Sequence, residues 1–141
     1  MFVKHKKVRM HDTDAAQILY FAKQFRFTHD TFEEFMEENG IPLYNIVHGT
    51  ADFTFAMVHA EADYLRPLVL GDQLEVQLSV KQAGRTSFSL YYEIYKEDDG
   101  SLAGTVTTVH VTLDRKTRVK IPLPKHLREI LEKYTNETTK E

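Results

Sequence analysis

Two aspartates, Asp12 and Asp14, stand where the sequence changes from an alternating pattern to a helical one. A carboxylate in such a place can act as a general base or as a nucleophile if its position and pKa suit the reaction. A helix that begins near Phe21 would offer backbone N–H groups without intrahelical partners, and these can stabilise an oxyanion. No Ser, Thr, Asp or Asn directly precedes Phe21 to cap these groups. For Asp12 we expect a turn-forming role, but the residues alone do not rank Asp14 above it.

The helix behind these carboxylates is the longest one that the sequence predicts. Within the stretch from His11 to Met36, apolar side chains recur at three- and four-residue spacing, which is typical of one helix face: Phe21, Phe25, Thr28, Phe32, Phe35 and Met36. Asn39-Gly40, followed by Pro42, marks the end of this helix.

The remaining chain mostly alternates between apolar and polar residues, which predicts strands. These strands cover residues 2–10, 52–64, 74–81, 87–95 and 103–113, with a short continuation at 119–121. Residues 41–50 are expected to form a loop with at most one helical turn. A short helix over residues 125–134 follows Pro122 and Pro124, and residues 136–141 read as a polar C-terminal tail. Short turns between the last four strands predict a meander.

These elements predict a single α+β domain over residues 1–135. A long helix rich in aromatic residues must be buried, and a curled antiparallel sheet wrapped around it achieves this. Such a sheet leaves its edges and one flank of the helix uncovered. We therefore expect a homodimer or homotetramer.

Composition excludes several classes of protein. The chain has 141 residues and a net charge of −3, which argues against nucleic acid as a partner. It contains no cysteine, so disulfides and thiolate chemistry are excluded. No apolar run is long enough to span a membrane and no signal peptide is evident, so we expect a cytoplasmic protein without a membrane partner. The histidines are scattered without metal-ligand spacing, and no metal site is predicted.

The segment 12–21, Asp-Thr-Asp-Ala-Ala-Gln-Ile-Leu-Tyr-Phe, resembles the Asp-x-Asp-x-x-Gly-x-Val-x-Tyr/Phe signature of the 4-hydroxybenzoyl-CoA thioesterase family. Segments 62–67, 71–72 and 84–87 resemble later strand and turn segments of that family. The resemblance covers nearly the whole chain and implies a hotdog fold and an acyl-CoA thioesterase. One position departs from the signature, because Gln17 stands where the family has glycine, and it could alter the turn or place an amide in the site.

The resemblance also implies roles for individual residues. It assigns the catalytic carboxylate to Asp14 and the oxyanion donor to the backbone N–H of Phe21. Gln17, Tyr20 and His59 become candidates for contact with the substrate. No cofactor is expected, because CoA is part of the substrate.

Coenzyme A carries phosphates that need cations near the mouth of the site. The resemblance favours the turn Arg85-Thr86-Ser87 for this role, with Lys81 and Arg66 as weaker candidates. Aromatic residues could line an acyl pocket, although such residues more often belong to the core: Tyr20, Phe25 and Phe53.

We expect hydrolysis of a thioester to a carboxylate and free CoA. The acyl group is either aromatic, such as hydroxybenzoyl or 1,4-dihydroxy-2-naphthoyl, or a short to medium aliphatic chain. An acyl-ACP thioesterase and a non-catalytic acyl-binding hotdog protein are the alternatives. A hotdog dehydratase is disfavoured, because the sequence has no His-Phe-Pro-Gly segment before the long helix.

Overall fold

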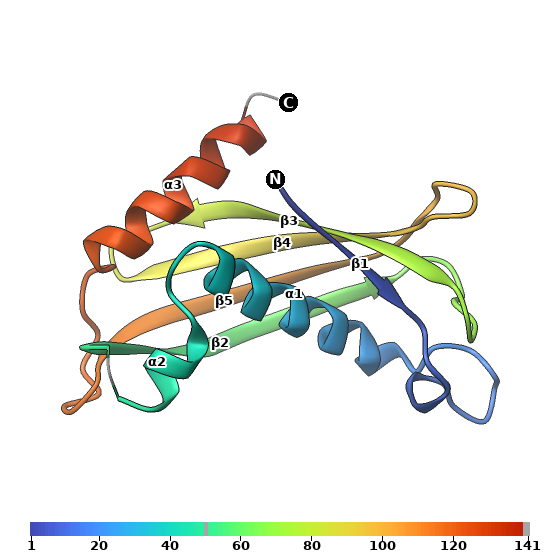
Figure 1. The fold of residues 1–141 in the computed structure, drawn as a ribbon, viewed down its shortest axis with the longest axis horizontal. Coiled ribbons are helices and arrows are strands. Elements are labelled where there is room, and N and C mark those ends of the chain that lie inside the picture. Colours follow the sequence, from blue (N-terminus) through green and yellow to red (C-terminus); the bar gives the residue numbers. More distant parts are fainter. Residues whose placement is uncertain (50, 140–141) are drawn as a thin grey trace.

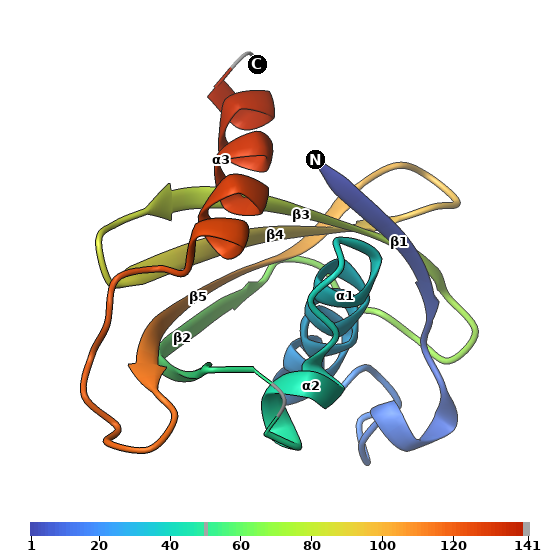
Figure 2. The same cartoon turned by 60° about the vertical axis from the view of Figure 1, so that its left-hand side comes forward.

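The computed structural model describes residues 1–49 and 51–139, which form one curled sheet around a central helix (Figures 1 and 2). The strands are β1 (Phe2–Lys7), β2 (Phe53–Tyr64), β3 (Gln73–Ala83), β4 (Ser87–Lys96) and β5 (Leu102–Asp114). The helices are the 3-10 turns η1 (Met10–Asp12) and η2 (Phe21–Lys23), and α1 (Gln24–Glu38), α2 (Leu43–Val47) and α3 (Lys125–Thr139). The predicted α+β hotdog architecture is confirmed.

The sheet is antiparallel and has the strand order β1-β3-β4-β5-β2. Strands β3, β4 and β5 form the expected meander, but the prediction that β2 belongs to it is wrong. Strand β2 pairs with β5 at the opposite edge, because β1 pairs with the free side of β3. The segment 65–72 connects the edge strand β2 to β3, from which β4 and β5 separate it in the sheet.

The core lies between the concave face of the sheet and α1. The strict alternation of β3 and β4 is confirmed by their burial, with every second side chain inside. Helix α1 contributes the buried side chains Phe27, Phe32, Phe35 and Met36. Burial of each such side chain contributes about 2 kcal/mol to the free energy of unfolding, and together they fix α1 against the sheet.

The faces of β2 differ from the alternation that the sequence predicts. A bulge at Val58 shifts the pairing between Met57, which opposes His110, and His59, which opposes Val109. One extra residue in a strand reverses the side to which later side chains point. Phe55 and Ala62 therefore both pack against the core, whereas uninterrupted alternation would place them on opposite faces.

Smaller differences concern the ends of elements. Residues 119–121 form only an isolated bridge, between Leu113 and Lys120, instead of a strand continuation. The C-terminal helix runs on to Thr139, so part of the expected tail is helical. The single turn expected within residues 41–50 is α2. In the part of the chain that the structure describes, no helix combines the length and apolarity needed to cross a bilayer.

Candidate active site

The segment that carries Asp14 is a small hairpin at one end of the sheet. Asp14 N–H donates to Ile18 O (3.1 Å), and an isolated bridge joins Thr13 to Leu19. Gln17 N–H donates to Asp14 O (2.9 Å), which closes a turn over residues 14–17. Leu19 N–H donates to Leu68 O (2.7 Å), so the hairpin is anchored to the β2–β3 connection.

The backbone conformation at Gln17 shows why the resemblance predicts glycine at this position. Its φ is +69°, in the left-handed region, where a three-residue hairpin loop places its last residue. Glycine adopts this conformation without the steric cost that a Cβ imposes. The turn is therefore formed despite the glutamine, at the cost of local strain in the backbone.

Asp14 is exposed at the start of this turn, with one carboxylate oxygen fixed. Its Oδ1 accepts a hydrogen bond from Ala16 N–H (2.8 Å), which holds the side chain in a defined direction. Among the described residues, no hydrogen bond to Oδ2 is observed. Asp14 thus offers an oriented carboxylate with one oxygen open to a water molecule or a substrate.

Asp12, in contrast, is fully buried and fully engaged. Its oxygens accept hydrogen bonds from Arg26 Nε (2.9 Å) and a terminal nitrogen of the same guanidinium (2.8 Å), and from Arg9 N–H (2.9 Å). Burial alone would raise the pKa of Asp12, but the hydrogen bonds and the charge of Arg26 outweigh it, so the pKa is lowered. The expected turn-binding role of Asp12 is confirmed, and Arg26 is a partner that the sequence analysis missed.

The chain enters the central helix at Phe21, through the 3-10 turn η2. Tyr20, which precedes η2, provides no side-chain cap, and its own N–H donates to Asp12 O (2.8 Å). Within residues 1–49 and 51–139, the N–H of Phe21 donates no hydrogen bond. This donor is therefore available, seven residues after Asp14 and just beyond the hairpin. The Tyr20 and Phe21 side chains beside it are half-exposed.

Two further residues approach the hairpin from the end of β2. Tyr64 and Arg66 border an open cleft of about 210 Å³ together with Ile18 of the hairpin. Burial raises the pKa of Tyr64, the hydrogen bond from Leu68 N–H (2.8 Å) to its hydroxyl opposes this, and the charge of Asp14 adds to the increase. Arg66 was the weaker candidate for a phosphate contact, yet it lies nearer to Asp14 in this chain than the Arg85 turn does.

His59 is not brought to the hairpin. It is exposed on the sheet face away from α1, where its Nε2 lies 3.6 Å from Glu61. It precedes Tyr64 by five residues, which is about 16 Å along a strand. Because of the bulge at Val58, His59 does not share the face of Phe55, as uninterrupted alternation would require.

The turn Arg85-Thr86-Ser87 lies between β3 and β4, at the end of the sheet opposite to the Asp14 hairpin (Figure 1). The length of β3 separates the two, roughly 33 Å. Arg85 is exposed, and the backbone of this turn is held by Arg128 and Leu123. Within one chain these residues cannot meet a substrate bound at Asp14.

The other aromatic candidates belong to the core. Phe53 is buried, and Phe25 is partly buried and packs against the core. Only Tyr20 of the three candidates is open to solvent beside the hairpin. Among the residues that the structure describes, no three His, Asp or Glu side chains gather as metal ligands would.

Comparison with known proteins identifies the family of the chain. The family model of the thioesterase-like superfamily matches residues 8–131. A 1,4-dihydroxy-2-naphthoyl-CoA hydrolase from Synechococcus elongatus is 34% identical over 125 residues, covering 89% of this chain and 90% of the relative. A similar hydrolase from Synechocystis is 32% identical over 123 residues, which is 87% of this chain and 88% of the relative.

Solved structures show the same fold. The crystal structure of a 1,4-dihydroxy-2-naphthoyl-CoA thioesterase from Synechocystis superposes with a TM-score of 0.86 at 31% identity, and the match covers 92% of this chain and 94% of that one. The predictions of a hotdog fold and of an acyl-CoA thioester hydrolase are confirmed. With its family model spanning most of the sequence, the chain belongs to the thioesterase-like superfamily.

Proposed function

We propose that this thioesterase acts on an aromatic acyl-CoA of the 1,4-dihydroxy-2-naphthoyl type, with Asp14 as general base or nucleophile and the Phe21 N–H as oxyanion donor. The observation that carries the site assignment is that two unengaged groups lie close together in the chain, one in the hairpin and one at the start of η2. Asp14 keeps a free carboxylate oxygen, and Phe21 keeps a free backbone donor. The relatives supply the acyl group, because two of them at 32–34% identity hydrolyse this thioester by name.

The reaction then needs only these two groups and water. As a base, Asp14 takes a proton from water while the oxygen attacks the thioester carbonyl. As a nucleophile, its own oxygen attacks, and water cleaves the resulting anhydride. On either route the carbonyl oxygen becomes an oxyanion, which the Phe21 N–H stabilises, and the C–S bond breaks to release the CoA thiolate, which is then protonated.

The unpaired edge of β2 supports a homodimer. Residues 57–61 are exposed along this edge, and Met57 and Val58 are apolar. The other edge strand, β1, carries Lys4, Lys6 and Lys7, and charged residues of this kind discourage edge pairing. Two β2 edges that pair antiparallel about a two-fold axis would continue the sheet from one copy into the next.

Such a dimer also accounts for the Arg85-Thr86-Ser87 turn. Antiparallel pairing of β2 with its copy turns the second sheet end for end. The turn of the second copy then comes to the end of the sheet that carries Asp14. In this arrangement each site takes its carboxylate from one chain and its Arg85 turn from the other, and Gln17 and Tyr20 border the same opening.

The decisive experiment measures CoA release from a panel of acyl-CoA thioesters that includes 1,4-dihydroxy-2-naphthoyl-CoA. Asp14→Asn is the sharp variant, because an amide oxygen can still accept the Ala16 N–H bond while the base and nucleophile are lost. We expect kcat to fall by about 10²- to 10⁴-fold with the fold intact. Asp99→Asn is the matched control, since Asp99 Oδ1 accepts from Ser101 N–H in the same kind of turn in a distant hairpin.

Full activity of Asp14→Asn would overturn the site assignment alone. If the wild type released no CoA from any member of the panel, the catalytic reading would fail in favour of acyl binding. The dimer is checked by the molar mass in solution, which should be twice that of the chain. Val58→Glu should lower this mass and the activity together.

A further inference from the structure

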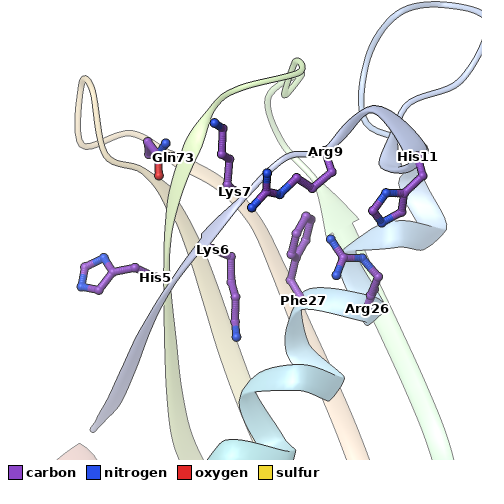
Figure 3. Close-up of a pocket in the computed structure, with 8 residues that line it drawn as sticks. All are labelled: His5, Lys6, Lys7, Arg9, His11, Arg26, Phe27 and Gln73. Atoms are coloured by element: carbon purple, nitrogen blue, oxygen red, sulfur yellow. The ribbon is translucent and has the colours of Figure 1, made fainter.

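A second concave site lies away from the β2 edge, where β1 leaves the sheet beside the first turn of α1 (Figure 3). Its volume is about 490 Å³, and none of its eight lining residues is acidic. The lining includes five basic residues and one aromatic residue that lie at the α1 side of the cleft or on β1 and the turn after it: Lys6, Lys7, Arg9, His11, Arg26 and Phe27. Figure 3 shows the Arg9 and Arg26 side chains on either side of Phe27, with His11 next to Arg26.

The cations of this cleft are only partly neutralised by the protein. Arg26 is paired with Asp12 and Asp30, and Lys6 is paired with Glu34. Within the described ranges 1–49 and 51–139, the side chains of Lys7 and Arg9 have no carboxylate partner. His11 Nε2 lies 3.5 Å from Asp12 Oδ1, but the Asp12 carboxylate is already paired with Arg26.

This excess of positive charge is local, because the whole chain has a net charge of −3. Like charges gathered in a cleft raise the local potential and attract anions. Guanidinium groups bind phosphate oxygens through directed hydrogen bonds, and lysine adds a mobile point charge. A volume of this size is in the range that small-molecule ligands occupy.

We propose that this cleft binds a polyphosphate, of the kind found in nucleoside diphosphates and in the 3′-phosphoadenosine diphosphate end of CoA. Lys7 and Arg9 are the principal ligands, and Arg26 and His11 line the inner end. A singly charged carboxylate would leave one of the two free cations unmatched, whereas a diphosphate matches both. The site shares Arg26 with the buried Asp12, so the occupant lies next to the hairpin that carries Asp14.

The test titrates inorganic pyrophosphate and ADP into the full-length protein by calorimetry. Lys7→Glu and Arg9→Glu change exposed side chains without a carboxylate partner, and the Arg9 N–H bond to Asp12 is retained in the second variant. We expect each to weaken binding of both probes by about tenfold or more, and binding to the wild type to weaken as salt is added. Lys120→Glu, an exposed lysine outside the cleft, makes the same charge change and should leave binding unaltered.

The source of the polyphosphate is separated by turnover. If the cleft holds the nucleotide end of the substrate, the same two variants raise KM for acyl-CoA about tenfold. They leave KM for an S-acyl-pantetheine, which lacks the nucleotide, unchanged. If the cleft holds a free nucleotide, the two variants still lose ADP binding, but KM changes for neither acyl-CoA nor S-acyl-pantetheine. Both outcomes support a polyphosphate site, and the binding measurement holds even if the chain proves inactive. Absence of pyrophosphate and ADP binding in the wild type, or equal binding in all variants, overturns it.

Discussion

The buried carboxylate of Asp12 holds the Arg26 guanidinium through two hydrogen bonds, and this pair joins the hairpin to the central helix. Asp12 stands two residues before Asp14, and Arg26 lies in the first turn of α1, five residues after Phe21. The pair therefore holds the hairpin that carries Asp14 in a fixed position relative to the start of the helix at Phe21. Under the proposed function we expect Asp12 to act as a positioning residue, without contact to the substrate.

Asp12→Asn tests this role. The amide keeps one acceptor but loses the charge, and Arg26 is then left with a weaker partner. Because the Arg26 side chain is about one-third exposed, water compensates in part, and we expect a loss of about 2 kcal/mol in the free energy of unfolding. Activity should fall mainly in kcat, since the site loses alignment rather than affinity. Urea unfolding and steady-state kinetics measure the two effects.

The same pair has a defined pH dependence. The pKa of Asp12 is lowered in the folded protein, so its contribution to stability is complete above the unfolded pKa. It is lost as the pH falls below about 4 and through the lowered folded value. The stability difference between wild type and Asp12→Asn should therefore be constant near neutrality and shrink in acid. A difference that grew in acid would contradict the ion pair.

Gln17→Gly should stabilise the protein. At φ of +69° a glutamine is strained and a glycine is not, which outweighs the greater entropy of glycine in the unfolded chain. We expect a gain of about 1 kcal/mol in the free energy of unfolding. Gln17→Ala is the control, because alanine keeps the strain and removes only the exposed amide. A loss of activity in both variants would show that the amide contacts the substrate.

The strands could be predicted from the sequence because each one buries a single face. Apolar and polar residues therefore alternate along the strand. The sequence could not predict the partner of β2, because the pairing depends on β1 already occupying the side of β3. The bulge at Val58 corresponds to a change of phase in the sequence: core-facing residues stand at odd positions before it, as Phe55 does, and at even positions after it, as Ala62 does. The misplacement of His59 follows from that one residue.

For the candidate site, the resemblance assigned roles to Asp14 and Phe21, whereas the alternation pattern predicts a role for neither, and both assignments stay predictions. Arg26 escaped notice because an arginine on a helix normally faces solvent, and only the tertiary structure shows a buried carboxylate opposite it. The cleft lined by Lys7 and Arg9 could not be predicted from the sequence for the same reason. From the sequence, clustered cations at the end of a strand predict a solvated edge. Only the tertiary structure shows that α1 lies beside them and forms a cleft.

A buried histidine lies in the core behind α1, apart from the chemistry. His110 stacks against both Phe32 (5.0 Å between ring centres) and Phe88 (4.9 Å), whose own ring centres are 6.5 Å apart. Its Nε2 lies 3.1 Å from Thr108 Oγ1, and its Nδ1 has no partner among the described residues. Burial, with a smaller effect of the His29 charge, lowers the pKa of His110 to about 4. The ring is therefore neutral in the folded protein at neutral pH.

Protonation of His110 should make the protein less stable in mild acid. Between pH 6.5, the ordinary pKa of histidine, and about 4, the unfolded chain binds a proton that the folded protein does not. The free energy of unfolding should therefore fall as the pH is lowered through this window, by about 3 kcal/mol in total. His110→Phe keeps an aromatic ring against Phe32 and Phe88 and should flatten this part of the curve. Urea unfolding at a series of pH values measures the slope, with the exposed His126→Phe as control. An unchanged slope in His110→Phe would assign the acid sensitivity to other groups.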